Sequence, residues 1–139
     1  PTSSPRRDAM INLYYFRHLP AERESPKMKK LLDRYGMAGY GFYWLLCEEL
    51  YFTPPHQFQL TDLRLRHLAK CAGIRAFKAK RMLIYMISSG LFTMRGAMLC
   101  SLRVDEEVRE VATALDRKKD SARRAGLASA AKRKAGGAA

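Results

Sequence analysis

The chain has 139 residues, of which 47% are hydrophobic and 10% aromatic, and its 26 basic side chains against 13 acidic ones give a net charge of +13 at pH 7. Its length and composition fit a single domain with a buried core. The sequence contains no apolar run near the roughly 18 residues of a membrane span, and no secretory signal. Its three widely spaced cysteines indicate a reducing, cytoplasmic setting. A charge surplus of this size indicates a polyanionic partner, most often DNA or RNA, whereas binding to an anionic membrane usually requires an amphipathic basic helix or a lipid anchor.

The first predicted helix begins at residue 26. Residues 1–10 form a predicted disordered leader, and residues 11–16 are apolar and aromatic, which predicts a strand or an extended segment. Ser25 is a favourable N-cap, Pro26 suits the first helical position, and Gly36 ends the helix. Apolar side chains recur along it at helical spacing, at Met28, Leu31, Leu32 and Tyr35.

Two more helices are predicted before residue 74. Residues 38–52 carry too many large apolar side chains for one face, so this helix is the predicted central, buried one. Residues 58–60 alternate and predict a short strand. Thr61 caps a third helix over residues 62–72, which Gly73 ends. Its predicted inward side chains are Leu63, Leu65, Leu68 and Ala69.

A fourth helix is predicted over residues 75–89, and Gly90 ends it. Residues 91–101 then predict two strands around a tight turn at Arg95 and Gly96. Apolar residues return to helical spacing over residues 104–116. Residues 117–139 are basic, rich in Ala and Gly and nearly free of large apolar side chains, which predicts a tail that is disordered when free.

The order of these elements predicts the fold class. We expect a mainly α protein, a winged helix-turn-helix with a β-hairpin wing, followed by a helix and a basic tail. The winged-helix domain is predicted over residues 11–103, the C-terminal helix over residues 104–116 and the tail over residues 117–139.

Several stretches resemble the N-terminal winged-helix domain of phage and prophage replication proteins, a family often described as similar to the N-terminal domain of the primosomal protein DnaD. The most specific part is the run from Tyr35 to Trp44, with the pattern YG-x-x-GYG-x-YW. The resemblance covers residues 13–130, with further matches at residues 15–18, 26–28, 89–92, 99–101 and 123–130.

The resemblance implies a module that binds DNA or oligomerises during replication initiation or primosome assembly in a bacterial host cell. Its implied partners are double-stranded DNA, a replication protein such as the helicase, and a second copy of the chain. Full-length relatives often carry a second domain that engages the replicative helicase, which these 139 residues do not hold. The sequence is therefore either a fragment of such a protein or a small protein that uses the module for another end.

The fourth predicted helix carries the main candidate DNA contacts. Arg75, Lys78 and Arg81 recur every three residues and span about 120° of one face, with Lys80 beside them. Residues 74–103 hold six basic residues and no acid. Such side chains neutralise phosphates, and Arg also reads guanine edges, whereas the alternative is an ordinary solvated face. The opposite, core-facing side is predicted to consist of Ala76, Ala79, Leu83 and Met86.

Two further basic segments are candidate contacts. Arg95 at the predicted wing tip is placed to touch a phosphate or a minor groove, or to serve only as a polar hairpin tip. The tail favours non-specific nucleic-acid affinity over a merely solubilising role. Its basic residues are Arg117, Lys118, Lys119, Arg123, Arg124, Lys132, Arg133 and Lys134.

Other constellations favour structural roles. The aromatic run over residues 40–44 favours core packing over base stacking. His67 and Cys71 have the spacing of a metal-chelating pair, and Cys47 and His56 are candidates to complete a zinc site, but no CxxC or HxxxH pair accompanies them. No phosphate loop, nucleophile elbow or pair of catalytic acids is present, so we expect neither an enzyme nor a cofactor or metal.

The sequence thus predicts a DNA-binding winged-helix protein of a phage, prophage or mobile element that acts in replication. Two alternatives remain open. A transcriptional or excision regulator uses the same fold and charges, and a protein-interaction module, such as a helicase adaptor or an inhibitor of a host or phage complex, needs no DNA.

Overall fold

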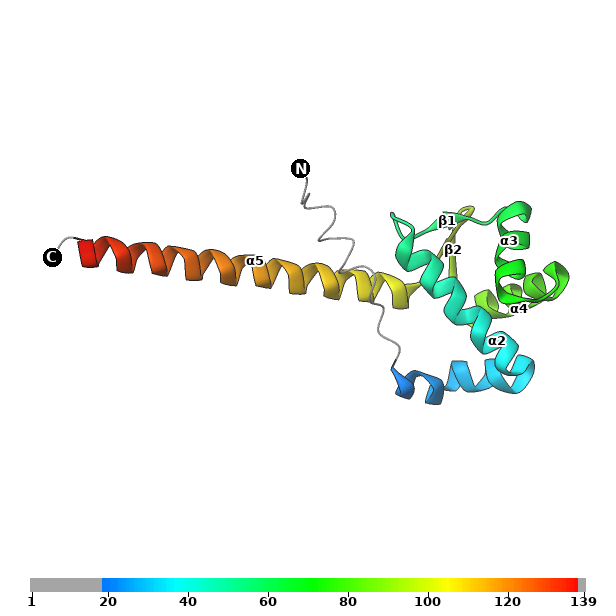
Figure 1. Ribbon diagram of the computed structural model, residues 1–139. Coiled ribbons are helices and arrows are strands. Elements are labelled where there is room, and N and C mark those ends of the chain that lie inside the picture. Colours follow the sequence, from blue (N-terminus) through cyan, green and yellow to red (C-terminus); the bar gives the residue numbers. More distant parts are fainter. Residues whose placement is uncertain (1–18, 138–139) are drawn as a thin grey trace. The chain divides into compact units, whose positions relative to one another are not determined.

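The computed structural model describes residues 19–137, so the predicted leader and the predicted extended segment at residues 11–16 lie outside the described residues. The described chain is mainly helical with one small antiparallel sheet. It divides into an N-terminal unit that ends at Glu107 and a C-terminal unit that begins at Val108. Its elements are η1 (Pro20–Glu24), α2 (Pro26–Phe52), β1 (Phe58–Gln59), α3 (Asp62–Ala72), α4 (Ala76–Ser88), β2 (Thr93–Arg95), β3 (Met98–Cys100) and α5 (Leu102–Gly137) (Figure 1).

Helix α2 consists of two helical parts joined at a kink. The Ser25 hydroxyl accepts a hydrogen bond from the Met28 N–H at 3.3 Å, which confirms the predicted N-cap. Gly36 interrupts the helix with φ 63° and ψ −154°, as its predicted role as a helix end requires. A Cβ at Gly39 would lie 2.6 Å from the Cβ of Tyr35, so glycine is also needed where the two parts approach each other.

The core of the N-terminal unit forms where the second part of α2 packs against α3 and α4 (Figure 1). The predicted central helix is confirmed, because Phe42, Leu46 and Leu50 are at most 1% exposed. Leu65, Leu68 and Ala69 of α3 are buried as predicted, but the prediction for Leu63 is wrong, since it is 79% exposed. Leu63 lies in the first turn of α3, where its side chain faces away from the packed helices. The α4 side of this core consists of Ala79, Met82, Leu83 and Met86.

A three-residue turn joins α3 to α4. The Thr61 hydroxyl accepts from the Arg64 N–H at the start of α3, and Gly73 ends this helix in the left-handed conformation at φ 71°, as predicted. The Gly73 N–H bonds back to carbonyls of the last turn, and α4 begins at Ala76. The two helices are thus joined by a short turn that contains a left-handed glycine.

The sheet has the strand order β1-β3-β2, and both pairings are antiparallel. Arg95 pairs with Met98, so the hairpin turn consists of Gly96 and Ala97 instead of the predicted Arg95 and Gly96. Gly96 takes the positive φ of 62° that a tight turn demands. Arg95 is therefore the last residue of β2 and not the tip of the hairpin.

Helix α5 is longer than predicted. The Ser101 hydroxyl caps its start by accepting from the Val104 N–H at 3.2 Å, and the helix continues to Gly137. The predicted end near residue 116 and the predicted disordered tail are corrected here. Disorder was predicted because residues 117–139 have no apolar face to pack and because their basic side chains repel one another. Local factors favour the helix instead, because alanine is frequent, proline is absent from residues 102–137, and Asp120 pairs with arginines three and four positions ahead.

Candidate nucleic-acid interface

The basic residues of α4 lie on its solvent side. Lys78, Lys80 and Arg81 are exposed, while Ala79, Leu83 and Met86 of the predicted opposite face are buried. Arg75 is also exposed, but it occupies the N-cap position, before the first helical residue. The predicted regular face of three residues is therefore corrected to Lys78 and Arg81 within the helix, with Arg75 at the end of the preceding turn.

The exposed face of α4 is also apolar, which the sequence reasoning missed. Phe77 is 68% exposed and Ile84 is 58% exposed, and the Arg81 guanidinium lies over the Phe77 ring at 5.5 Å from its centroid. Phe77, Arg81 and Ile84 have the spacing of one helix face, and this pattern could have predicted that apolar and basic side chains share it. In the described part of the chain, no carboxylate forms an ion pair with Lys78, Lys80 or Arg81.

The hairpin offers less free charge than predicted. The Arg95 guanidinium lies 3.3 Å from a carboxylate oxygen of Asp105, in the first turn of α5. Both side chains are partly exposed, so this pair contributes little to stability. It nevertheless gives Arg95 an anionic neighbour that a DNA phosphate would have to replace.

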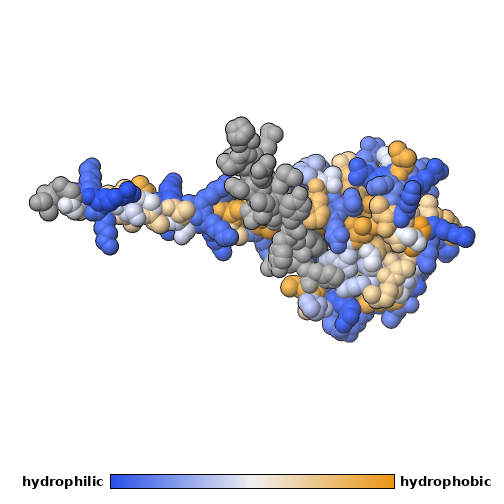
Figure 2. Space-filling model, viewed as in Figure 1, coloured by the Kyte–Doolittle hydropathy of each residue, from blue (hydrophilic) through white to orange (hydrophobic). Residues whose placement is uncertain are grey.

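The C-terminal unit carries exposed charge on all sides of its helix. Residues 108–137 hold nine basic and three acidic residues, and at 3.6 residues per turn the basic ones surround the helix. Figure 2 shows hydrophilic side chains along opposite edges of this unit. Asp120 pairs with Arg123 at 3.0 Å and with Arg124 at 2.9 Å. The remaining predicted tail contacts are exposed in the structure, at Arg117, Lys118, Lys119, Lys132, Arg133 and Lys134.

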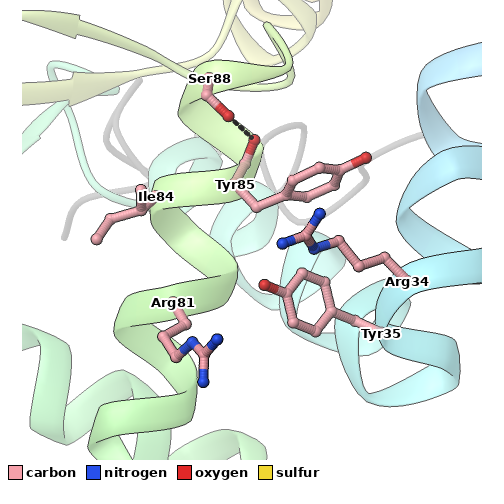
Figure 3. A pocket seen from close by; sticks show the side chains of 6 residues that line it. All are labelled: Arg34, Tyr35, Arg81, Ile84, Tyr85 and Ser88. Carbon is pink, nitrogen blue, oxygen red and sulfur yellow. Dashed lines mark hydrogen bonds between the residues drawn. The ribbon is translucent and has the colours of Figure 1, made fainter.

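A pocket of about 480 Å³ lies between α2 and α4, and none of the sequence predictions included it as a site. It is lined by Arg34 and Tyr35 just before the α2 kink and by Arg81, Ile84, Tyr85 and Ser88 of α4 (Figure 3). No local sequence pattern connects the two halves of this pocket, because they lie more than forty residues apart.

A buried polar cluster joins η1, α2 and the first turns of α5. The Arg103 guanidinium binds Glu22 at 2.8 Å and Glu107, which is 1% exposed, at 3.1 Å. Burial lowers the pKa of Arg103, but its hydrogen bonds to the two carboxylates outweigh burial and raise it. Burial also raises the pKa of Tyr43, and it raises the pKa of the neighbouring Cys47 thiol to about 12. At neutral pH Arg103 is therefore charged while Tyr43 and Cys47 are neutral, which fits a structural role for the cluster.

The proposed metal ligands do not assemble. The Cys71 sulfur lies 3.7 Å from Nε2 of His67, but among residues 19–137 no group of three or more His, Cys, Asp or Glu side chains is placed to hold a metal ion. Cys47 is buried beside Tyr43, and Nδ1 of His56 contacts the Leu50 carbonyl at 3.2 Å.

Comparison with known proteins adds no relative. No protein-family model, curated protein or solved structure matches the chain. None of the helices within the described residues is both long enough and apolar enough to cross a bilayer.

Proposed function

We propose that the protein binds duplex DNA, with α4 in contact with the groove and the β2–β3 hairpin as a wing beside it. The observation that carries this proposal is the exposed side of α4, where Lys78, Lys80 and Arg81 have no paired carboxylate among the described residues. In a helix-turn-helix the second helix lies in the major groove and its N-terminal residues approach the bases. Arg75 and Lys78 occupy that end of α4.

The arrangement of elements supports a winged form of this motif. The antiparallel hairpin follows α4 directly, and β1, which lies between α2 and α3, completes the sheet at the edge of β3. A hairpin in this position would lie beside the DNA that α4 contacts. Because Arg95 already pairs with Asp105, we assign the wing a smaller electrostatic contribution than α4.

The C-terminal unit would add general affinity. Its nine basic residues are distributed around a helix and thus favour phosphate contacts over base readout. Each neutralised phosphate releases counterions, which makes such binding steeply dependent on salt.

For the biological role we propose replication initiation or primosome assembly of a phage, prophage or related element. The support is the resemblance of the run from Tyr35 to Trp44 to phage and prophage replication proteins. A transcriptional or excision regulator uses the same surface, and a defined operator would distinguish it.

A protein-interaction module is the second candidate function, and the exposed Phe77 and Ile84 favour it. Apolar side chains on a groove-facing helix contact thymine methyl groups, but they also serve as anchors in protein interfaces. In this case Phe77→Ala would abolish binding of a protein partner and leave DNA binding nearly unchanged.

The decisive experiment compares two triple variants on duplex DNA by fluorescence anisotropy. One replaces Lys78, Lys80 and Arg81 with Gln; the matched control replaces Arg117, Lys118 and Lys119 with Gln and removes the same charge from the C-terminal unit. We expect wild-type affinity to fall with salt with a log–log slope of several units. The α4 variant should lose more affinity than the control, because side chains on a packed helix are already ordered before binding.

Three results would contradict the proposal. Wild-type protein that fails to bind duplex at low salt would exclude DNA binding, and a flat salt response would exclude phosphate contacts. Equal losses from both triple variants, on a candidate origin and on random duplex alike, would remove the special role of α4.

A further inference from the structure

The pocket between α2 and α4 has the composition of an anion site. Its lining includes two arginines, Arg34 and Arg81, and two tyrosines, Tyr35 and Tyr85, and among the described residues no acidic side chain. Ile84 forms an apolar side of the pocket, while the Ser88 hydroxyl already donates to the Tyr85 carbonyl at 2.9 Å. Among the described residues, the charged side chains that line this pocket, Arg34 and Arg81, are both positive.

The exposed Arg34 side chain contacts two aromatic rings. It lies 5.6 Å from the ring centroid of Tyr35 and 4.9 Å from that of Tyr85, and the two rings contact each other edge to face at 5.6 Å. Figure 3 shows Arg34 reaching from α2 toward α4 between these rings. A guanidinium that lies over aromatic rings keeps N–H groups available as donors.

The charge of Arg34 and Arg81 is not neutralised inside the described part of the chain. Neither side chain forms an ion pair with a carboxylate there. Both arginines line the same pocket, so an anion bound there would be attracted by two positive charges. The rings already restrict Arg34, which lowers the entropy lost when the anion binds.

The backbone explains why Arg34 and Tyr35 meet α4. Gly36 turns the chain immediately after Tyr35 with a positive φ, and Gly39 leaves room for the Tyr35 Cβ. Two glycines of the YG-x-x-G pattern therefore place the α2 half of the pocket, and α4 supplies the other half.

We propose that this pocket binds a phosphate group. A phosphate presents several acceptor oxygens, which suits guanidinium forks and phenol donors from two elements better than it suits the single charge of a side-chain carboxylate. Because Arg81 belongs both to the pocket and to the exposed side of α4, the phosphate source that fits best is the DNA backbone next to the groove. The choice of source rests on the proposed function; a free terminal phosphate of a nucleotide has the same chemistry.

The test uses the full chain with Arg34→Lys and Arg34→Gln, and with Lys70→Gln as the control. Lys70 is exposed in the last turn of α3 and does not line the pocket. Arg34→Lys keeps the charge but loses the planar, stacked fork. We expect both Arg34 variants to weaken duplex binding about tenfold at fixed salt, and Arg34→Gln to lower the log–log salt slope by about one. The control should weaken binding less than about threefold.

Two outcomes would exclude the DNA backbone as the source of the phosphate while leaving DNA binding intact. One is duplex binding by both Arg34 variants that equals that of the control. The other is wild-type binding by Arg34→Lys alongside weak binding by Arg34→Gln, since long-range charge would then account for the whole effect.

A second measurement separates this proposal from the proposed function. Inorganic phosphate, and separately a 5′-mononucleotide, is titrated into the full chain while the Arg Nε–H resonances are followed by NMR. Saturable shifts in wild type that disappear in Arg34→Lys support the pocket even if duplex DNA does not bind, and a stronger response to the nucleotide would favour the free-phosphate source. No shift with either probe, combined with no effect of the Arg34 variants on duplex binding, refutes the pocket.

Discussion

Among single residues, the buried pair of Tyr43 and Cys47 shows how packing alters chemistry. Tyr43 is 4% exposed and Cys47 is fully buried, and they share a hydrogen bond beside the cluster of Arg103 with its two carboxylates. Burial disfavours the charged forms of both groups, so their pKa values lie above the ordinary values of 10.0 and 9.0. Cys47 is accordingly a packed thiol and not a reactive one.

These raised pKa values predict a loss of stability in alkali. The unfolded chain releases both protons from about pH 9 to 10, whereas the folded chain keeps the Cys47 proton to about pH 12 and has a raised pKa for Tyr43 as well, so the free energy of unfolding falls as pH rises above 9. Each group contributes up to about 1.4 kcal/mol per pH unit. Tyr43→Phe and Cys47→Ala should therefore flatten the decline of the free energy of unfolding, measured with urea between pH 8 and 11. Parallel curves for variants and wild type would contradict the assigned burial.

At the scale of elements, the α2 kink depends on backbone conformation alone. The φ and ψ of Gly36 lie in a region that residues with a Cβ almost never occupy, and a Cβ there would meet no atom within 4 Å. The kink therefore requires glycine for conformational reasons and not for lack of space.

Gly36→Ala should lower the free energy of unfolding by about 1–3 kcal/mol through this strain. Gly41→Ala is the matched control, because Gly41 is exposed within the helical part of α2 and its added Cβ also meets nothing within 4 Å. The control should raise stability by up to about 1 kcal/mol, since alanine favours helix over glycine. Urea unfolding of both variants measures the difference, and a neutral Gly36→Ala would show that the kink is relaxed without glycine.

For the whole molecule, the division at Glu107 separates packing from surface charge. The N-terminal unit holds the core, whereas residues 121–136 of the C-terminal unit are all exposed. The C-terminal unit thus has little buried area to contribute to stability but carries a large share of the positive charge.

Removal of residues 117–139 should therefore change the melting temperature by less than about 2 °C. The same truncation removes a net charge of +7 and should lower duplex affinity and reduce the log–log salt slope by about three or more. Far-UV circular dichroism should lose helical signal, because residues 117–137 belong to α5. A large drop in melting temperature would show instead that this segment stabilises the N-terminal unit.

The sequence by itself determined the features that depend on neighbours within one helical turn. The Ser25 and Thr61 caps, the Gly73 end of α3 and the glycine in the hairpin turn follow from hydrogen bonds and dihedral angles within a few residues. The buried central helix followed from the density of its apolar side chains. Local rules also extend α5 beyond its predicted end, where the missing apolar face had been given too much weight.

Only the tertiary structure decided what each surface faces. Leu63 fits the apolar pattern of α3, yet nothing packs over it, and Arg95 meets Asp105 because the hairpin and the first turn of α5 lie together. The pocket of Arg34 and Tyr85 joins residues about fifty positions apart, which no local pattern connects. Helix periodicity specifies which residues share a face, but the packing of distant elements decides which face is covered. The candidate phosphate site is formed by that packing.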